Sequence, residues 1–586
     1  MLTKLTLRNF KRFGEVEIEL GNPVVLVGPN NSGKTSALQA LTLWDLGLKR
    51  WGEKNRDRKT GGRRAPGQRI GAVINRKDVL CIPIPKTNLL WRDLHLREAQ
   101  TSEGGKPATK NIRIEIILEG TTKDKEWTCG LEFDYANEES FYCRPVRLGG
   151  GTGDERMSVP EEAFAVSFAF LPPMSGLAAS ETILPPGAIN VRIGEGRTAE
   201  VLRNLCSMVR EKDMRRWNAL KNKIHGLFGI TLEEPVKNAE RGEVEMSYSQ
   251  SGISLDLSCS GRGAQQTLLL LAYMHANPGS VILLDEPDAH LEFLRQRQTY
   301  EILSEVARDN GNQLIIATHS EVLLNEAAGR DMVVAFVGKP HRIDDRGSQA
   351  AKALKEIGYE HYVEAEQRGW VLYLEGPTDL KVLRAFAAKL NHREAASALE
   401  SPFVHYVADK PGEVSRHFYG VREAVPHLKA VAIFDRLDKG LPENLGALGL
   451  TWRRREIENY FCYPETLEAY AEATAKKETA GPLFEPAEIA KRKEAMAASI
   501  KEIEGYLRGL DKGSPWDDDF KVSDEFLIPL FKAYFKRLGI YNLMDKKGFY
   551  ELAEYVPVER IDGEVAEKLD ALAAIAREAR PISSDI

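Results

Sequence analysis

Apolar and polar residues alternate near the start of the chain in a way that predicts antiparallel strands. Residues 3–9 and 15–20 form the first such pair, and the apolar run PVVLVG (23–28) that follows suits a buried parallel strand. A helix is expected from Thr35 to about Leu46. Further along, the pattern predicts antiparallel strands within 111–135, a helical stretch from about Thr198 to Phe228, strands at 230–256 and a helix that begins near Gly263.

Two later stretches alternate between strand and helix patterns, and they predict an α/β fold. Residues 281–338 follow the order strand, helix, strand, helix, strand, which is typical of an α/β sheet. A second alternation starts at WVLYLEG (370–376) and continues through FVHYVA (403–408) and AVAIFD (430–435). The expected parts are a first α/β domain at 1–340 with an insertion at about 195–250, a linker at 341–368, and a second α/β domain at 369–586 that is mainly helical from about Glu485.

The composition is typical of a soluble globular protein. Of the 586 residues, 43% are hydrophobic and 28% are charged, and no stretch approaches the roughly 20 apolar residues that span a bilayer. The start of the chain shows no signal-peptide core, and the six cysteines lack CxxC spacing. We therefore expect a cytoplasmic protein with no membrane partner.

One basic segment contrasts with the net charge of −6. Nine Lys or Arg residues lie between Lys49 and Arg69, against only Glu53 and Asp57. Two interpretations stay open: a solvated loop, or a contact with the phosphate backbone of DNA through counterion release.

A P-loop of the form GxxxxGK[ST] occupies residues 28–35, between a predicted strand and a predicted helix. Glycines in such a loop let backbone N–H groups approach phosphates. Lys34 would add a charge at the β- and γ-phosphates, and Thr35 would offer a hydroxyl to Mg²⁺. The predicted ATP-binding residues of this segment are Gly28, Asn30, Asn31, Ser32, Gly33, Lys34, Thr35 and Ser36.

Three further segments fit the same nucleotide site. The strand 281–284 leads to Asp285, expected to hold the magnesium, and to Glu286, expected to orient or deprotonate the attacking water. Upstream, Ser260 and Gly261 open a helix whose N–H groups suit an anion. Downstream, the strand LIIATHS (314–320) contains His319, placed to sense a γ-phosphate.

The order of these motifs resembles the ABC ATPase family, in the branch that contains RecF, SMC-like and OLD (overcoming lysogenization defect) proteins. The resemblance covers about residues 1–340 and implies that the Ser260-Gly261 signature completes the nucleotide site of a second subunit, so that the chain at least homodimerises. The signature departs from LSGGQ by reading S-G-R-G, and the Q-loop glutamine is not located. The insertion at about 195–250 is a candidate dimerisation segment.

Carboxylates follow two strands of the second α/β domain. Glu375 ends the strand 371–374, Asp379 begins the next helix, and Asp435 and Asp438 follow the strand 430–434. Because the carboxyl ends of parallel strands lie together, these acids are expected to converge on a divalent cation, Mg²⁺ or Mn²⁺. Such a site activates water for phosphodiester cleavage. The alternative is that the acids are helix caps and exposed turn residues.

This pattern resembles a TOPRIM domain, over residues 369 to about 465. The resemblance implies catalytic roles for Glu375, Asp379 and Asp435. The usual DxD is replaced by D-R-L-D, so either Asp438 or Glu456 and Glu458 of WRRREIENYF (452–461) would complete the site. Two further groups of basic residues have two open interpretations: they bind phosphate, or they are merely solvated. These are the arginines Arg453, Arg454 and Arg455, and the lysines Lys546 and Lys547, of which Lys547 is assigned the catalytic role that OLD nucleases give to a lysine.

An ABC ATPase joined to a TOPRIM domain resembles the OLD nucleases, an arrangement shared by the nuclease subunit of the Gabija antiphage system. The resemblance implies an ATP-dependent nuclease that cleaves or nicks DNA in phage defence, with ATP and Mg²⁺ or Mn²⁺ as cofactors and a second defence protein among its partners. One alternative is an RNA nuclease, for example of transfer RNA, as in the PARIS system. Another is a repair or structural ATPase with an inactive TOPRIM domain.

Overall fold

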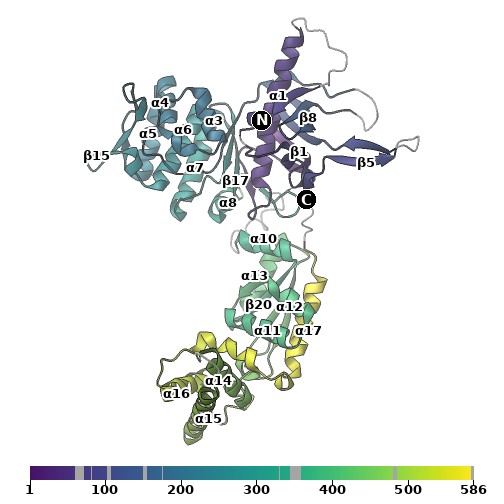
Figure 1. Ribbon diagram of the computed structural model, residues 1–586, viewed down its shortest axis with the longest axis vertical. Helices are drawn as coiled ribbons and strands as arrows, with labels where there is room; N and C mark the ends of the chain where they lie inside the picture. Colours follow the sequence, from purple (N-terminus) through teal and green to yellow (C-terminus); the bar gives the residue numbers. More distant parts are fainter. Residues whose placement is uncertain are drawn as a thin grey trace. The chain divides into compact units, whose positions relative to one another are not determined.

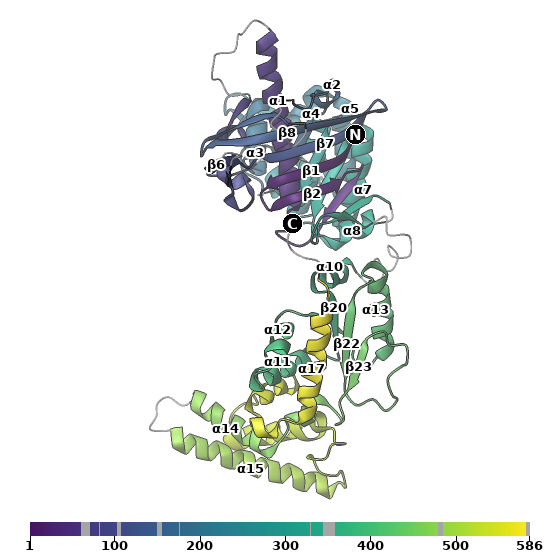
Figure 2. The same cartoon turned by 90° about the vertical axis from the view of Figure 1, so that its right-hand side faces the viewer.

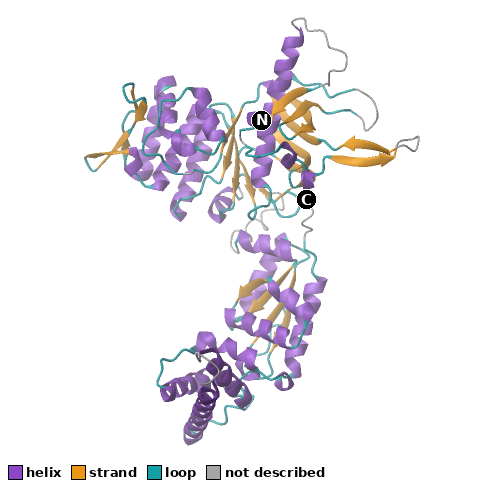
Figure 3. Cartoon of the chain, viewed as in Figure 1, coloured by secondary structure: helices purple, strands orange, loops and turns teal. Residues whose placement is uncertain are grey.

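The computed structural model describes the chain as two compact units. The described residues are 1–59, 71–80, 82–101, 107–148, 155–174, 176–328, 330–343, 358–478 and 485–581. Those up to 343 belong to unit 1 and those from 358 belong to unit 2 (Figure 1). Unit 1 contains two large sheets, whereas helices predominate in unit 2 (Figure 3). No helix among these residues combines the length and apolarity that crossing a membrane requires.

Unit 1 begins with an antiparallel sheet, as the alternation at 3–9, 15–20 and 111–135 predicts. Leu5 pairs with Ile18 and Leu7 pairs with Val16, so one face of the sheet is apolar and buried. Its strands, in spatial order, are β2 (Phe13–Glu19), β1 (Leu2–Phe10), β7 (Ile114–Thr122), β8 (Lys125–Asn137), β9 (Ser140–Pro145) and β4 (Ala72–Asn75). A separate hairpin consists of β5 (Arg97–Thr101) and β6 (Pro107–Asn111).

The second sheet of unit 1 is parallel except for its last strand. Most of its residues are buried, which explains why these strands are continuous apolar runs and do not alternate. In spatial order they are β10 (Phe168–Leu171), β16 (Val281–Asp285), β17 (Gln313–Thr318), β3 (Val24–Val27), β18 (Met332–Ala335) and β19 (His341–Arg342). The predicted α/β alternation over 281–338 is confirmed.

Helix α1 (Lys34–Lys59) contacts strands of both sheets and is the centre of the unit 1 core. Trp44 is fully buried and stacks on Trp127 of β8, with 6.3 Å between the ring centroids. The helix is longer than the predicted 35–46, because Leu48 continues its apolar face into the core. The basic segment 49–69 is therefore helical up to Lys59, and its remainder lies outside the described residues.

The expected insertion forms a mainly helical part of unit 1. Helices α4 and α5 pack against α6, which separates them from the sheets (Figure 1). The helices of this unit after α1 are α2 (Glu161–Phe164), α3 (Pro186–Gly194), α4 (Leu202–Lys212), α5 (Met214–Phe228), α6 (Arg262–Ala276), α7 (Phe293–Asn310) and α8 (Glu321–Ala327). The small strands are β11 (Thr231–Leu232), β12 (Val236–Asn238), β13 (Glu243–Glu245), β14 (Ser247–Gln250) and β15 (Ile253–Asp256).

Unit 2 is built on a four-stranded sheet in which all strands are parallel, in the order β21 (Phe403–Tyr406), β20 (Trp370–Leu374), β22 (Lys429–Phe434) and β23 (Leu448–Thr451). Side chains of β20 alternate between its two faces: Trp370, Leu372 and Leu374 join the core with α11 (Pro377–Lys389), α12 (Arg393–Glu400) and α17 (Gly563–Glu578). The other face carries α10 (Tyr359–Arg368) and α13 (Pro411–Ala424) (Figure 2).

Helix α10 corrects one expectation. Residues 341–368 have weak patterning and were expected to form a linker, but 359–368 form a helix that ends at Gly369, whose φ is 69°. Tyr362 and Ala365, three residues apart on one face, are buried. Only four of its ten residues are apolar or aromatic (Tyr359, Tyr362, Val363 and Ala365) and none lies in its last three positions, so the periodicity is too weak for the sequence to reveal this helix.

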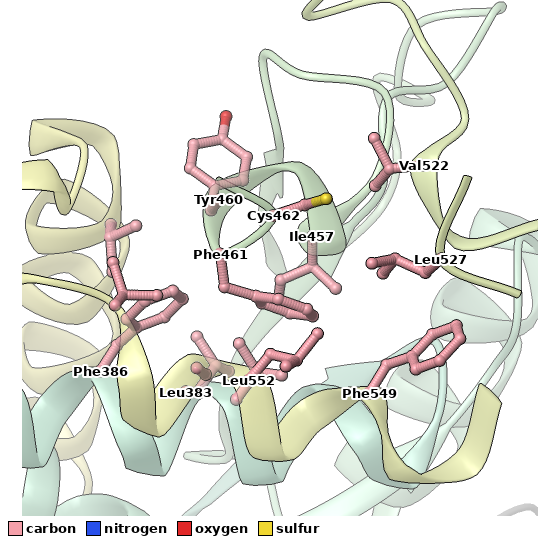
Figure 4. Packing of buried hydrophobic residues seen from close by; sticks show 14 of the residues in the cluster. Leu383, Phe386, Ile457, Tyr460, Phe461, Cys462, Val522, Leu527, Phe549 and Leu552 are labelled. Carbon is pink, nitrogen blue, oxygen red and sulfur yellow. The ribbon is translucent and has the colours of Figure 1, made fainter. Parts of the chain in front are cut away.

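The helices after the sheet pack around the segment 452–461. Ile457, Tyr460 and Phe461 are buried against Leu383 and Phe386 of α11 (Figure 4). This packing fixes the backbone on either side of Glu456 and Glu458. The helices involved are α14 (Pro464–Glu478), α15 (Glu485–Gly509), α16 (Ile528–Leu538) and the 3₁₀ segment η8 (Lys546–Tyr555).

Candidate functional site

The predicted nucleotide site lies at the carboxyl ends of three neighbouring strands, β16, β17 and β3. Thr35 Oγ1 donates a hydrogen bond to Asp285 Oδ1 at 3.0 Å. His319 Nδ1 lies 3.1 Å from Glu286 Oε1. The structure thus brings the P-loop, both acids and the histidine together, as the order of the motifs predicts.

The P-loop backbone leaves no room for side chains at two of its glycines. A Cβ at Gly28 would lie 2.8 Å from Phe336 O, and one at Gly33 would lie 2.6 Å from the Phe13 ring; both glycines have positive φ. Lys34 Nζ donates to Gly28 O at 2.7 Å and to Pro29 O at 2.9 Å. The lysine is therefore held by the carbonyls of its own loop.

Burial disfavours the charged forms of Asp285 and Lys34, and a bound cation and phosphates would offset this effect. Desolvation raises the pKa of Asp285 to about 6, although the hydrogen bond from Thr35 opposes the shift. Desolvation also lowers the pKa of Lys34. Both charged forms gain from a Mg²⁺–phosphate group, because each would then face an opposite charge.

The structure places one further residue, Arg12, next to the P-loop. The predicted pair Ser260-Gly261 lies instead at the start of α6. Arg12 lies in the turn before β2. Its Cδ is so close to Gly33 that a Cβ added to this glycine would lie 2.9 Å from it. A lone arginine in NFKRFGE carries no motif, so sequence reasoning missed it. Gly261 is the N-cap of α6, Ser260 Oγ donates to Leu257 O, and Ser260 O accepts from the side-chain amide of Gln265 in α6.

A second site, the acid cavity, lies at the carboxyl end of the unit 2 sheet. Its volume is about 510 Å³. Each strand of the sheet is followed by a segment that reaches it. The acidic residues that line the cavity are Glu375, Asp379, Asp409, Asp435, Asp438, Glu456 and Glu458, and the basic residues are Arg436, Arg455, Lys521 and Lys546.

The structure brings three acids close enough to share one ion. Ligand oxygens of Asp435, Glu456 and Glu458 all lie within 4.8 Å of one another. Asp435 Oδ1 accepts from Ile457 N at 2.8 Å, and Glu456 accepts from both the backbone N–H and the hydroxyl of Ser523. These bonds hold Asp435 Oδ1 and both oxygens of Glu456 in place.

The carboxylates of this cavity repel one another strongly. Desolvation, then the charges of Asp409 and Asp379, raise the pKa of Glu375. Desolvation followed by the charge of Glu375 raises the pKa of Asp435. Desolvation, then the charge of Glu456, raises the pKa of Glu458 to about 8. So many raised carboxyl pKa values in one cavity indicate a site that gains from positive charge.

The donor set fits a divalent cation of the Mg²⁺ or Mn²⁺ type. All candidate ligands are carboxylate oxygens, which such ions prefer. Glu375 Oε2 is buried and accepts no hydrogen bond from an N–H or hydroxyl group of the described residues; its neighbours are the carboxyls of Asp409 and Asp435. A bound cation would give this oxygen a partner and would offset the repulsion.

Two predicted residues lie differently from the sequence expectation. Asp438 is a predicted metal ligand, but its side chain is 82% exposed and pairs with Arg455 at 3.0 Å, since the extra residue of D-R-L-D moves it along the turn. Lys547 is the predicted catalytic lysine, but Lys546 lines the cavity. The backbone N–H of Lys547 donates to Asp545, which caps η8.

Other expectations are met in part. Asp379 lines the cavity and also caps α11, because its Oδ2 accepts from Gly376 N at 3.0 Å; both interpretations of this acid hold. Arg453 pairs with Glu567, and Arg454 pairs with Asp562. These two arginines are therefore bound within unit 2, which favours a structural role for them over phosphate contact.

Sequence reasoning missed Asp409, Lys521 and Ser523. Asp409 comes directly after the apolar run FVHYVA (403–408), as Glu375 comes directly after β20, so the same pattern indicates it. Lys521 and Ser523 come from a segment remote in sequence from the strands. No motif marks them.

We expect the metal-free protein to lose thermal stability as pH rises. The carboxyls of Glu375, Asp435 and Glu458 have raised folded-state pKa values, so the folded chain binds more protons than the unfolded chain above about pH 4. Stability therefore falls from about pH 4 until the pH has risen through the folded values, near pH 8. Thermal unfolding without divalent ions should show Tm falling by roughly 5 °C between pH 5 and 8.5. Asp435→Asn should flatten this dependence; an unchanged slope in that variant would contradict the account.

Two family profiles match segments of unit 1. The profile described as "AAA domain, putative AbiEii toxin, Type IV TA system" matches residues 199–325, and the one described as "AAA ATPase domain" matches residues 1–45. These segments contain the P-loop, the Ser260-Gly261 pair, both acids after β16 and His319. The chain therefore carries an ATPase domain of the AAA type, and ATP with Mg²⁺ is the usual cofactor of such domains. No curated protein matches the chain.

Solved structures similar to this chain include heads of SMC proteins. The SMC head domain from Thermotoga maritima is 15% identical, with 58% of this chain and 98% of that chain covered and a TM-score of 0.31. The SMC head bound to the C-winged helix domain of ScpA is 16% identical, with 60% and 99% covered and a TM-score of 0.34. The SMC head with an extended coiled coil bound to the C-terminal domain of ScpA, derived from Pyrococcus furiosus, is 15% identical, with 61% and 99% covered and a TM-score of 0.34.

Proposed function

We propose that this protein is an ATP-dependent nuclease of the OLD type, in which unit 2 is a TOPRIM domain that cleaves or nicks DNA with Mg²⁺ or Mn²⁺. The observation that carries the proposal is the acid cavity, where Glu375, Asp435 and Glu458 gather with raised pKa values. A solvated set of turn acids would keep ordinary pKa values. Acids forced together in this way are typical of a metal-dependent catalytic site.

The residues of this cavity have separable roles in the proposed reaction. Glu375, Asp435, Glu456 and Glu458 would hold the divalent cation, which supplies activation of water and neutralisation of the phosphodiester charge when bound. Ile457 N orients Asp435, and Ser523 orients Glu456. Lys546, held by Asp524 at 2.5 Å, would release that partner and face the developing negative charge of the phosphate.

The ATPase of unit 1 would act as an assembly platform and a nucleotide-sensitive gate. Ser260 and Gly261 sit at the N-terminus of α6, whose free N–H groups suit a phosphate, and their hydrogen bonds do not engage the P-loop of the same chain. We infer that they complete the nucleotide site of a second copy, so that ATP favours a homodimer. A role in defence against phage follows from the OLD resemblance, as does a second defence protein as partner.

A second candidate substrate is RNA, such as transfer RNA. It draws support from the segment 452–461, because Glu456 and Glu458 of this segment join Asp435 in the three-acid group. The same segment, WRRREIENYF, is similar to one in the nuclease-like family of the PARIS system. DNA remains the preferred substrate because the OLD resemblance covers both units.

A cleavage assay with both substrates tests this proposal. Purified protein with ATP and Mn²⁺ is expected to nick supercoiled plasmid, and EDTA or Glu375→Gln should stop the nicking, because each removes the cation. Transfer RNA is added in parallel as substrate and as competitor. Cleavage of RNA alone would favour the second candidate. Intact substrates with every divalent ion, identical in wild type and Glu375→Gln, would leave only an ATPase with an inactive second unit.

A further inference from the structure

Three histidines meet on the face of the unit 2 sheet opposite α11. They come from three separate elements: His361 from α10, His405 from β21 and His417 from α13. One ligand nitrogen of each lies within 4.8 Å of the others. None of the three lines the acid cavity, and the proposed nuclease reaction uses none of them.

The three histidine rings are packed closely against one another. His417 Nε2 lies 2.8 Å from His361 Nδ1. The rings of His405 and His417 stack with centroids 3.9 Å apart, and the His361 ring lies 5.0 Å from that of His405. The three ligand nitrogens, which lie within 4.8 Å of one another, are close enough to bind one metal ion at the usual Zn–N distance of about 2.0–2.1 Å after small side-chain rotations.

The buried Tyr373 provides the support that a metal-binding histidine ordinarily has. Its hydroxyl lies 2.8 Å from His417 Nδ1, and its side chain is fully buried in β20. Histidine ligands usually engage their second ring nitrogen with a fixed partner, which sets the tautomer and the ring orientation. With the Tyr373 oxygen as acceptor, His417 carries its proton on Nδ1, and the lone pair of Nε2 faces His361 Nδ1, where an ion would replace the contact between the two nitrogens.

The charge state of the group suits a cation. Desolvation lowers the pKa of His405 to about 4 and that of His417 to about 3, and it also lowers the pKa of His361. All three rings are therefore neutral at physiological pH, and a metal ion displaces no protons from them. Imidazole nitrogen without thiolate suits Zn²⁺, and not Mg²⁺ or Mn²⁺, which prefer carboxylate oxygens.

We propose that His361, His405 and His417 form a binding site for Zn²⁺, with Tyr373 positioning His417. The site is separate in ligand chemistry from the acid cavity. It joins α10, the first helix among the described residues of unit 2, to β21 and α13, so the ion acts as a cross-link that holds this helix on the sheet.

Zinc binding by the whole chain tests the site. Protein without a histidine tag is stripped with EDTA, and Zn²⁺ is titrated in excess Mg²⁺ against a chromophoric chelator. Wild type is expected to bind one Zn²⁺ tightly and to unfold at a higher temperature with it. His405→Ala and His361→Gln should each weaken binding at least about 100-fold, and Tyr373→Phe about 10-fold.

Two controls distinguish this site from others in the chain. His427→Ala removes an exposed histidine of the same unit and should leave Zn²⁺ affinity unchanged. Asp435→Asn removes an acid-cavity ligand and should also leave it unchanged. The proposal is overturned if stripped wild type takes up no Zn²⁺, or if Asp435→Asn loses the ion while folded His405→Ala and His361→Gln keep it.

Discussion

Replacing Asp435 with asparagine is expected to reduce DNA cleavage at least about 1,000-fold while ATP hydrolysis stays unchanged. Asparagine keeps the Oδ1 acceptor for Ile457 N, so the local fold should persist. It removes the charge that the neighbouring Glu456 and Glu458 need in order to hold a divalent ion. A 1,000-fold loss corresponds to about 4 kcal/mol of transition-state stabilisation, within the range that a catalytic metal supplies. The rate of plasmid nicking under single-turnover conditions measures it.

Asp438→Asn is the matched control for that change. Asp438 lies three residues away on the same turn, but its side chain is 82% exposed and is paired with Arg455. We expect less than a tenfold loss of cleavage. If Asp438→Asn were as damaging as Asp435→Asn, the D-R-L-D acid would be a ligand after all, and the assignment of Glu456 and Glu458 would be wrong.

Lys34→Ala is expected to lower the affinity for ATP at least about 100-fold and to abolish ATP hydrolysis. Lys34 Nζ donates to Gly28 O and Pro29 O within its own loop, and burial lowers its pKa. A phosphate would give this buried ammonium a charged partner in place of the two carbonyls. A loss of 100-fold corresponds to about 2.7 kcal/mol of binding free energy. Titration with a fluorescent ATP analogue measures it.

Lys49→Ala, in the same helix, serves as the control for that substitution. Lys49 is exposed and pairs with Asp45 at 2.6 Å, so nucleotide affinity should not change. Unaltered ATP binding in Lys34→Ala would show that the P-loop lysine does not contact nucleotide in this protein. The nucleotide dependence of cleavage in Lys34→Ala then shows whether ATP activates or restrains the nuclease.

Sequence reasoning predicted the parts of the fold and the sites that local patterns encode. The apolar runs that end at Asp285, Glu375 and Asp435 are buried parallel strands, and the carboxyl ends of such strands meet at one edge of the sheet. The spacing of glycine, lysine and threonine in the P-loop is enough to predict its backbone geometry. These features need only a few consecutive residues, so one sequence is enough to show them.

What the sequence could not give depends on contacts between distant segments. Ser523 is 67 residues from the carboxylate of Glu456 that it binds. Whether Lys546 or Lys547 faces the cavity depends on where the 3₁₀ segment η8 begins, and a single residue decides it. The histidine cluster joins residues from 361 to 417 that share no motif. Tertiary packing brings these groups together, and no pattern of neighbouring residues predicts such contacts.

Binding of Mn²⁺ to the nucleotide-free protein tests the central claim most directly, because it depends on neither DNA nor ATP. Electron paramagnetic resonance measures free Mn²⁺ as the protein is titrated. The account predicts that wild type and His405→Ala bind Mn²⁺ equally, and that the double variant Glu375→Gln, Asp435→Asn loses this binding. Equal Mn²⁺ binding by wild type and the folded double variant would contradict it.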